Sequence, residues 1–199
     1  MKAPVFLEVS AGFCIRTVLL LLILPHPWAI AMIAAAIFHE AAHILAIMTC
    51  GGNIYSIKLG MSGVQILTPT LNYLKEAITA AAGPLGSFLL LILYHVFPQI
   101  AVCGLMQGAY NLLPMYPMDG GRILNCFLVF FFGREKAAHL MTVIQSICMI
   151  FILASGCVFC LKYDLYAFLP VLILEIVLKV KKFLEKGGSR QYNRIDYES

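Results

Sequence analysis

The sequence predicts an all-α integral membrane protein with about six transmembrane helices, a small membrane-associated β-hairpin or sheet after the second helix, and a broken fourth helix. Of the 199 residues, 61% are hydrophobic and 12% are charged, and the mean hydropathy is +0.90. A soluble domain is usually nearer half apolar and a quarter charged. We therefore expect a single polytopic transmembrane domain over residues 1–186, followed by a short polar cytoplasmic tail over 187–199.

Six apolar stretches are long enough to cross a bilayer, which takes about 20 helical residues. They cover residues 5–24, 27–49, 72–97, 99–132, 138–160 and 163–183. The first stretch can also be interpreted as a signal-peptide core. Arg16 within it and the long apolar run that follows favour an uncleaved first span.

The distribution of basic residues favours a cytoplasmic location for both termini. With six spans, three basic regions all lie on the cytoplasmic side: the stretch KVKKFLEKGGSRQYNR, the loop at 50–71 with Lys58, and the loop GREK at 133–136. This arrangement follows the positive-inside rule, and seven spans would lose it. The net charge of +4 is concentrated mainly in the C-terminal stretch and indicates no nucleic-acid partner.

Two regions interrupt the helical pattern. In residues 50–70, glycines punctuate the short stretches NIYSIKL and VQILT, which predicts a β-hairpin or small sheet, with an amphipathic connector as the alternative. The fourth apolar stretch contains NLLPMYPMDGG, whose prolines and glycines indicate that the backbone leaves the helix. Such backbone is tolerated at membrane depth only when it is buried in protein or lines a cavity. Whether 99–132 forms one broken helix or two short ones is left open.

The most specific pattern is FHEAAHILA at residues 38–46. On a helix, His39 and His43 lie one turn apart on the same face, so both imidazoles can bind one metal ion. Glu40 is rotated by about 100° from His39 and can contact a water on that metal without binding the metal itself. An unpaired carboxylate deep in an apolar span is costly, which favours a functional role over a buried packing network.

A third protein ligand is expected, because a zinc site with two histidines needs one more ligand and an open position for water. The candidates in the apolar stretches are His95, His139, Glu175 and Asp119. The two histidines lie near the ends of spans, where a histidine is usually an interfacial residue, and Glu175 has a lysine one turn away. Asp119 lies in the interrupted fourth stretch, where a cavity is expected, and is therefore favoured.

Together these motifs resemble those of the site-2 protease family of intramembrane zinc metalloproteases. The shared features are HEAAH, the glycine-rich hairpin, AAGPLGS and NLLPMYPMDGG, and the resemblance extends from about residue 10 to 160. It implies that His39, His43 and Asp119 bind one Zn²⁺ per chain and that Glu40 is the catalytic glutamate. It also implies that Asn111 contacts the substrate or the oxyanion.

The resemblance extends to AAGPLGS, where Gly83 and Pro84 match a structural Gly-Pro pair at a helix crossing. Ser87 stands where the family often has Asn, so the resemblance leaves open whether a polar contact is made at that position. The spacer Ala41–Ala42 stands where the family often has a glycine, and small residues there still allow close helix packing. We expect a catalytic core with no inserted PDZ domain and no appended nucleotide-sensing module.

The activity implied by the resemblance is hydrolysis of a peptide bond within or next to a transmembrane segment of a membrane-protein substrate. Glu40 would activate the zinc-bound water. The hairpin at 51–67 is a candidate edge for pairing with an unwound substrate. Expected partners are the substrate and the lipid bilayer; a regulatory membrane partner or a homo-oligomer is left open. The resemblance implies a multi-pass protein of a bacterial cell membrane.

Two other functions are left open at this point. One is a proteolytically inactive scaffold of the same family, against which the intact HEAAH and Asp119 argue. The other is a zinc-binding or zinc-transporting membrane protein. A transporter would need several embedded ligands arranged as a pathway, whereas the sequence offers one tight cluster and Asp119.

Overall fold

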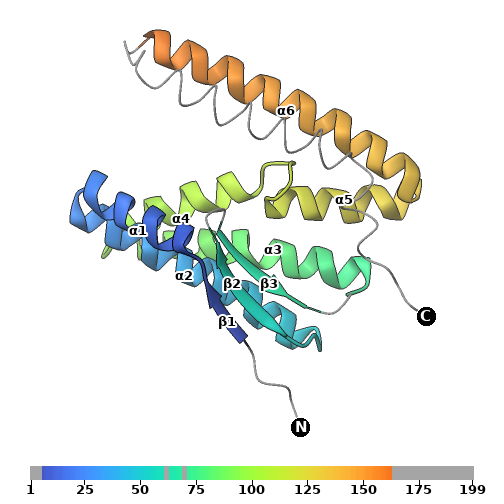
Figure 1. The fold of residues 1–199 in the computed structure, drawn as a ribbon, viewed down its shortest axis with the longest axis horizontal. Helices are drawn as coiled ribbons and strands as arrows, with labels where there is room; N and C mark the ends of the chain where they lie inside the picture. Colours follow the sequence, from blue (N-terminus) through green and yellow to red (C-terminus); the bar gives the residue numbers. More distant parts are fainter. Residues whose placement is uncertain (1–5, 61–62, 69–70, 163–199) are drawn as a thin grey trace.

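The computed structural model describes residues 6–60, 63–68 and 71–162, which form a mainly helical fold with one small sheet (Figure 1). The elements are β1 (Phe6–Val9), α1 (Ala11–Ile23), α2 (His26–Thr49), β2 (Ser56–Gly60), β3 (Gly63–Leu67), α3 (Tyr73–Leu89), the 3-10 helix η1 (Leu90–Leu93), α4 (Pro98–Asn111), α5 (Asp119–Phe132) and α6 (Arg134–Lys162). The predicted last span at 163–183, Glu175 and the polar tail lie outside the described residues.

Three helical segments of the described chain are long and apolar enough to cross a membrane. They are His26–Thr49, Tyr73–Leu93 and Arg134–Val158. They coincide with the second, third and fifth apolar stretches of the sequence. The predicted total of six transmembrane helices stays a prediction.

Local sequence explains where the two site-bearing helices α2 and α3 begin and end. Prolines at the start of α2 fit its first turn, where their missing N–H groups are not needed. α2 ends before Gly51, which has a φ of 75°. At the start of α3, the side chain of Asn72 accepts a hydrogen bond of 3.0 Å from the backbone N–H of Lys75.

The centre of the fold is α3, which packs against α2, α4 and α5. Small residues allow these helices to approach closely. A Cβ added at Gly86 would lie 2.6 Å from the Cβ of Ala42 on α2, and one added at Gly104 would lie 2.7 Å from a backbone oxygen of α3. Ala31 and Ala35 are buried between α2 and its neighbours together with Leu90. The Gly-Pro pair Gly83–Pro84 is buried within α3, as expected at a helix crossing.

The fourth apolar stretch forms two short helices, α4 and α5, joined by residues 112–118, which answers the question that the sequence left open. The two helices follow one another across the view in Figure 1. The predicted interruption at NLLPMYPMDGG is therefore confirmed. Its glycines are needed because the connection folds back on the start of α5: a Cβ at Gly121 would lie 2.6 Å from the carbonyl carbon of Met115.

The predicted β-hairpin is confirmed, and the structure adds a third strand to it. β2 and β3 pair antiparallel, from Ser56 opposite Leu67 to Gly60 opposite Gly63. β1 lies parallel to β2 on its other side, so the strand order is β1-β2-β3.

The prediction of a single span over residues 5–24 is wrong for residues 6–9, which form β1. Glu8 lies opposite Lys58 in the register and forms an ion pair of 2.7 Å with it. Ser10 then accepts a hydrogen bond from the backbone N–H of Phe13 and starts α1, a helix of 13 residues.

The predicted loop GREK at 133–136 is also wrong. Gly133, with a φ of 75°, makes the turn by itself, and α6 begins at the next residue. α5 and α6 pack through Leu128, Ala137 and Met141, which are nearly inaccessible to solvent. Chain reversal therefore takes one residue, because glycine adopts this left-handed conformation without strain.

Candidate metal centre

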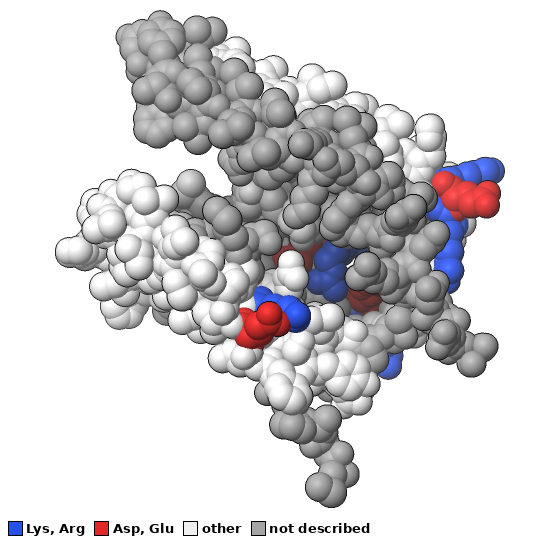
Figure 2. Space-filling model, in the orientation of Figure 1, with Lys and Arg blue, Asp and Glu red and all other residues white. Residues whose placement is uncertain are grey.

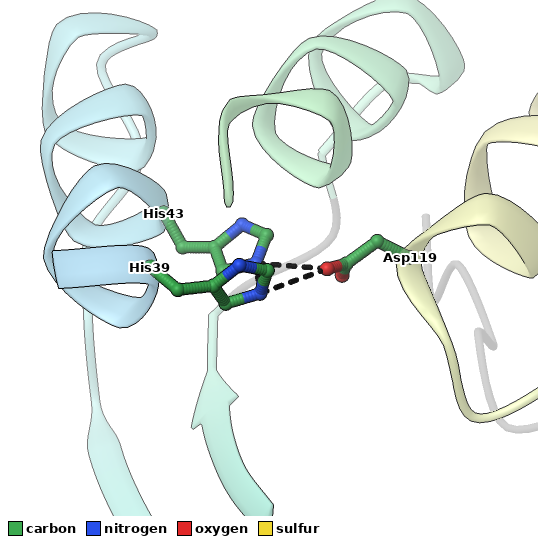
Figure 3. A group of neighbouring side chains, drawn as sticks. All are labelled: His39, His43 and Asp119. Atoms are coloured by element: carbon green, nitrogen blue, oxygen red, sulfur yellow. Dashed lines mark hydrogen bonds and ion pairs between the residues drawn. The ribbon is translucent and has the colours of Figure 1, made fainter. Parts of the chain in front are cut away.

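Two histidines and one aspartate from separate helices converge in the middle of the fold (Figure 3). His39 and His43 project from α2, and Asp119 is the first residue of α5. Oδ2 of Asp119 lies 3.2 Å from Nε2 of His39 and 3.1 Å from Nε2 of His43. The two Nε2 atoms lie 3.2 Å apart. The helical spacing of HEAAH thus places both imidazoles on one face, as predicted.

The spacing of these three atoms fits a small tetrahedral metal ion. Ligand atoms about 2.0–2.2 Å from such an ion lie about 3.3–3.6 Å from one another, close to the observed separations. All three residues are nearly inaccessible, with exposed fractions of 2%, 6% and 8% for His39, His43 and Asp119. Among the described residues they form the one group of three side chains able to hold a metal ion.

The hydrogen bonding of His43 also favours a cation at this point. Its Nδ1 lies 2.7 Å from the carbonyl oxygen of Thr79, which can only accept, so Nδ1 carries the proton. In a neutral imidazole Nε2 is then left with a lone pair, which faces the carboxylate oxygen of Asp119. Converging lone pairs in a buried place repel one another unless a positive charge lies between them. Imidazole and carboxylate ligands suit zinc.

The ring of His39 is oriented by Ser87, at whose position the family resemblance left a polar contact open. Nδ1 of His39 lies 2.8 Å from Oγ of Ser87, which is completely buried. Hydrogen bonds of this kind to the second ring nitrogen fix the tautomer and the ring orientation of metal-binding histidines. The polar contact at Ser87 is therefore present, although the family often has Asn at that position.

Both of these supporting groups belong to one stripe along α3, which also includes Glu76 and Gly83. The members are spaced three or four residues apart, so they lie on the same helical face. Gly83 lies directly against the imidazoles: a Cβ added there would lie 2.8 Å from Cε1 of His39 and would overlap the ring of His43. The stripe therefore leaves room for both rings and supplies their hydrogen bonds.

The two residues expected to act on the substrate also lie near the three candidate ligands. The amide nitrogen of Asn111, at the end of α4, lies 3.4 Å from Nε2 of His39. Glu40, next to His39 on α2, is half-buried and lies within range of the charges of His39, His43 and Asp119. Glu40, Asn111 and the group of His39, His43 and Asp119 thus occupy one region where α2, α4 and α5 meet.

The structure does not bring the other candidate ligands to this region. His95 follows η1 and is exposed, with its ring against that of Tyr94. His139 is exposed on α6. Sequence reasoning missed Thr79, which contributes through its backbone carbonyl and so leaves no signature in residue type. It also missed Arg122, although its position three residues after Asp119 on a helix is a usable signal.

Comparison with known proteins agrees with this arrangement. Residues 62–155 match the sequence profile of peptidase family M50. The chain resembles peptidase family M50 over these residues, which make up slightly less than half of its length. The M50 profile covers Gly83, Asn111 and Asp119, while HEAAH lies ahead of the matched residues.

Individual relatives of the chain carry the name zinc metalloprotease. The chain is 28% identical over 144 residues to zinc metalloprotease MJ0392 of Methanocaldococcus jannaschii, a match that covers 63% of this chain and 42% of that protein. It is 29% identical over 119 residues to the putative zinc metalloprotease Rip3 of Mycobacterium tuberculosis, covering 50% of this chain and 30% of the relative. The matched regions are thus less than half the length of either relative.

The fold is similar to that of a solved structure, the site-2 protease from Methanocaldococcus jannaschii. The TM-score is 0.59 at 24% sequence identity, and the match covers 89% of this chain and 88% of the other. At this level of identity the likeness establishes the fold.

Proposed function

We propose that this protein is a zinc metalloendopeptidase that cleaves membrane proteins within or next to their transmembrane segments. The observation that carries the proposal is the buried convergence of Nε2 of His39, Nε2 of His43 and Oδ2 of Asp119 within 3.2 Å of one another. These three residues would hold one zinc ion per chain. Zinc bound there would polarise the scissile carbonyl and make the attacking water more acidic.

Glu40 would act as the general base and then as the general acid. Its position one residue after His39 places it beside the ligands but outside the ligand set. The carboxylate takes a proton from the attacking water and delivers it to the nitrogen of the leaving amine. Asn111 would donate from its amide to the developing oxyanion or to the substrate backbone. Its amide nitrogen already lies 3.4 Å from an atom of the ligand set.

The proposed substrate is a transmembrane segment that unwinds, because a helix hides its carbonyl groups in its own hydrogen bonds. An unwound segment needs partners for its backbone groups. In the three-stranded sheet the outer edges belong to β1 and β3, and we propose that one of them pairs with the substrate. Replacing residues 51–67 with a flexible linker should abolish cleavage; full cleavage would contradict this part of the proposal.

The proposed location is a lipid bilayer, with the protein as a multi-pass protein and both termini in the cytoplasm. Large apolar side chains stay exposed on the outside of the described helices, among them Leu22, Ile92 and Phe130 at 78% each. Exposed apolar surface of this extent is unfavourable in water and favourable in hydrocarbon. The basic residues of the C-terminal stretch set the proposed orientation.

The decisive experiment compares the wild type with Glu40→Gln. Each is co-expressed with a panel of single-span membrane proteins that carry tags at both ends, and each is purified for zinc analysis. We expect zinc in both, and cleavage at least about a hundredfold slower in the variant, because removal of a general base leaves the ligands intact. Identical cleavage by both proteins would contradict the proposal. Failure of both to cleave, with no zinc in the purified protein, would also contradict it.

A second variant tests the ligand set independently. Asp119→Ala removes the one ligand contributed by α5 and should lose tightly bound zinc. His139→Ala, which removes an exposed histidine outside the centre, is the matched control and should keep it. Unchanged zinc binding in Asp119→Ala would show that Asp119 is not the third ligand.

A further inference from the structure

Asp119 offers only one of its carboxylate oxygens to the histidines, and the other oxygen faces a cation. Oδ2 lies 3.2 Å from Nε2 of His39 and 3.1 Å from Nε2 of His43. Oδ1 lies 3.7 Å from Nη1 of Arg122, one turn further along α5. We infer that Arg122 is a positioning residue, which holds Oδ1 and so aims Oδ2 at the two histidines. This inference rests on the zinc site of the proposed function.

The guanidinium of Arg122 also lies near a second carboxylate. Its Nε lies 3.7 Å from Oε1 of Glu76, a residue of the first turn of α3. The ion pairs therefore run from Glu76 through Arg122 to Asp119 and join α3 to α5. Figure 2 shows acidic and basic side chains together in the middle of the face drawn there, surrounded by uncharged and grey atoms.

Partial burial makes this arrangement more than a surface ion pair. The side chain of Arg122 is 35% exposed, that of Glu76 is 23% exposed and that of Asp119 is 10% exposed. Charges at such depth are screened less by water and salt than exposed charges are. Arginine also suits the position, because it is always charged and its planar group has donors that face two carboxylates at once.

The chemical consequence concerns the number of oxygens that Asp119 presents to a metal. A carboxylate can bind through one oxygen or through both, and a catalytic zinc site needs a position left open for water. With Oδ1 facing Arg122, Asp119 would bind a metal through Oδ2 alone. Arg122 thus maintains the metal affinity and keeps the fourth position open, as residues that hydrogen-bond to metal ligands do elsewhere.

The test measures zinc affinity by chelator competition on the purified full-length chain in detergent. Arg122→Gln should bind zinc about 10–100-fold more weakly than the wild type. Arg122→Lys keeps the positive charge and should recover most of the lost zinc affinity. If Arg122 had a purely structural role, the zinc affinity would not depend on whether the substituted residue is charged. Lys75→Gln, which removes an exposed positive charge beside Glu76, is the matched control and should bind zinc like the wild type.

The link through Glu76 is tested by a double-mutant cycle. Glu76→Gln should weaken zinc binding by about threefold or more in the wild-type background and have no further effect on Arg122→Gln, because it acts through that residue. Wild-type zinc affinity in Arg122→Gln, or equally weak binding in Arg122→Lys and Arg122→Gln, would overturn the inference. Additive effects of the two glutamine substitutions would also overturn it. If Arg122→Gln does not fold, the Glu76→Gln variant decides the question alone. A wild-type zinc affinity in Glu76→Gln would then overturn the inference.

Cobalt substitution adds a spectroscopic readout. The visible absorption of bound cobalt(II) reports the coordination number, and we expect Arg122→Gln to shift it towards the weaker bands of a five-coordinate ion. An unchanged spectrum would overturn the role in keeping the fourth position open. A wild type without any zinc would refute the proposed function instead, so the two failures are distinguishable.

Discussion

Oγ of Ser87 lies 2.8 Å from Nδ1 of His39, and the two residues have exposed fractions of 0% and 2%. Such a short side chain reaches the imidazole because the helices that carry the two residues approach closely. Gly83 and Gly86 of α3 lie directly against α2, with no space for a Cβ. Helix packing and ligand orientation are therefore consequences of the same small residues.

Removing the hydroxyl of Ser87 should weaken metal binding. In Ser87→Ala, Nδ1 of His39 loses its partner in a buried place, so the ring is free to adopt the wrong tautomer. We expect zinc affinity to fall by about tenfold or more, measured by chelator competition. Ser146→Ala, at an exposed serine of α6, is the control. Equal affinity in both variants would show that the hydrogen bond to Ser87 is dispensable.

Adding one methyl group at Gly83 should displace both imidazoles. The new Cβ in Gly83→Ala would overlap the ring of His43 and press against that of His39. Overpacking of this kind usually destabilises a protein by about 1–3 kcal/mol. We expect a lower melting temperature and the loss of stoichiometric zinc, whereas Leu85→Ala, at an exposed residue of the same turn, should keep the metal. Full zinc content in Gly83→Ala would contradict the close approach of the two helices.

Substitution of Asn111 should separate catalysis from metal binding. Loss of one oxyanion donor typically lowers kcat by about a hundredfold or more, so we expect this for Asn111→Ala, with KM little changed. Zinc content should stay at the wild-type level, because Asn111 is outside the ligand set. The neighbouring Tyr110→Phe, at a half-exposed side chain, serves as the control for kcat. A kcat close to that of the wild type would remove Asn111 from the mechanism.

Zinc should stabilise the folded protein, because its proposed ligands join α2 to α5. A ligand that binds only the folded state stabilises it by about 4 kcal/mol when present at about 1,000 times its Kd. Thermal unfolding in detergent should therefore occur at a clearly higher temperature with zinc than after chelation. The difference should disappear in Asp119→Ala. A zinc-induced shift that persists in this variant would mean that zinc stabilises the protein from another site.

The convergence of His39, His43 and Asp119 was predictable from sequence because the signals of these residues are local or compositional. HEAAH needs only the helical repeat to bring His39 and His43 together, and the structure shows their Nε2 atoms 3.2 Å apart. Asp119 follows from the rarity of a carboxylate in an apolar stretch that prolines and glycines interrupt. The roles of Glu40 and Asn111 in catalysis stay predictions.

Other parts of the structure could not be predicted, because they depend on pairings between distant segments. β1 is four residues long and pairs with β2 about 50 positions later, with nothing in its own pattern to separate it from the apolar run that follows. The carbonyl of Thr79 is available in any residue type, so its bond to His43 has no sequence signature. The choice between one broken helix and two short ones depended on how the 112–118 connection folds against Gly120 and Gly121.

Because Thr79, Gly83 and Ser87 lie on one stripe of α3, the orientation of the imidazoles of His39 and His43 depends on the position of this single helix. If α3 slid or turned by a single residue, the carbonyl of Thr79 and the hydroxyl of Ser87 would leave both imidazoles in the same movement. The place of Gly83 would then be taken by a residue with a side chain. Movement of this helix would therefore remove both hydrogen bonds from the two histidines together, without any change in the histidines themselves.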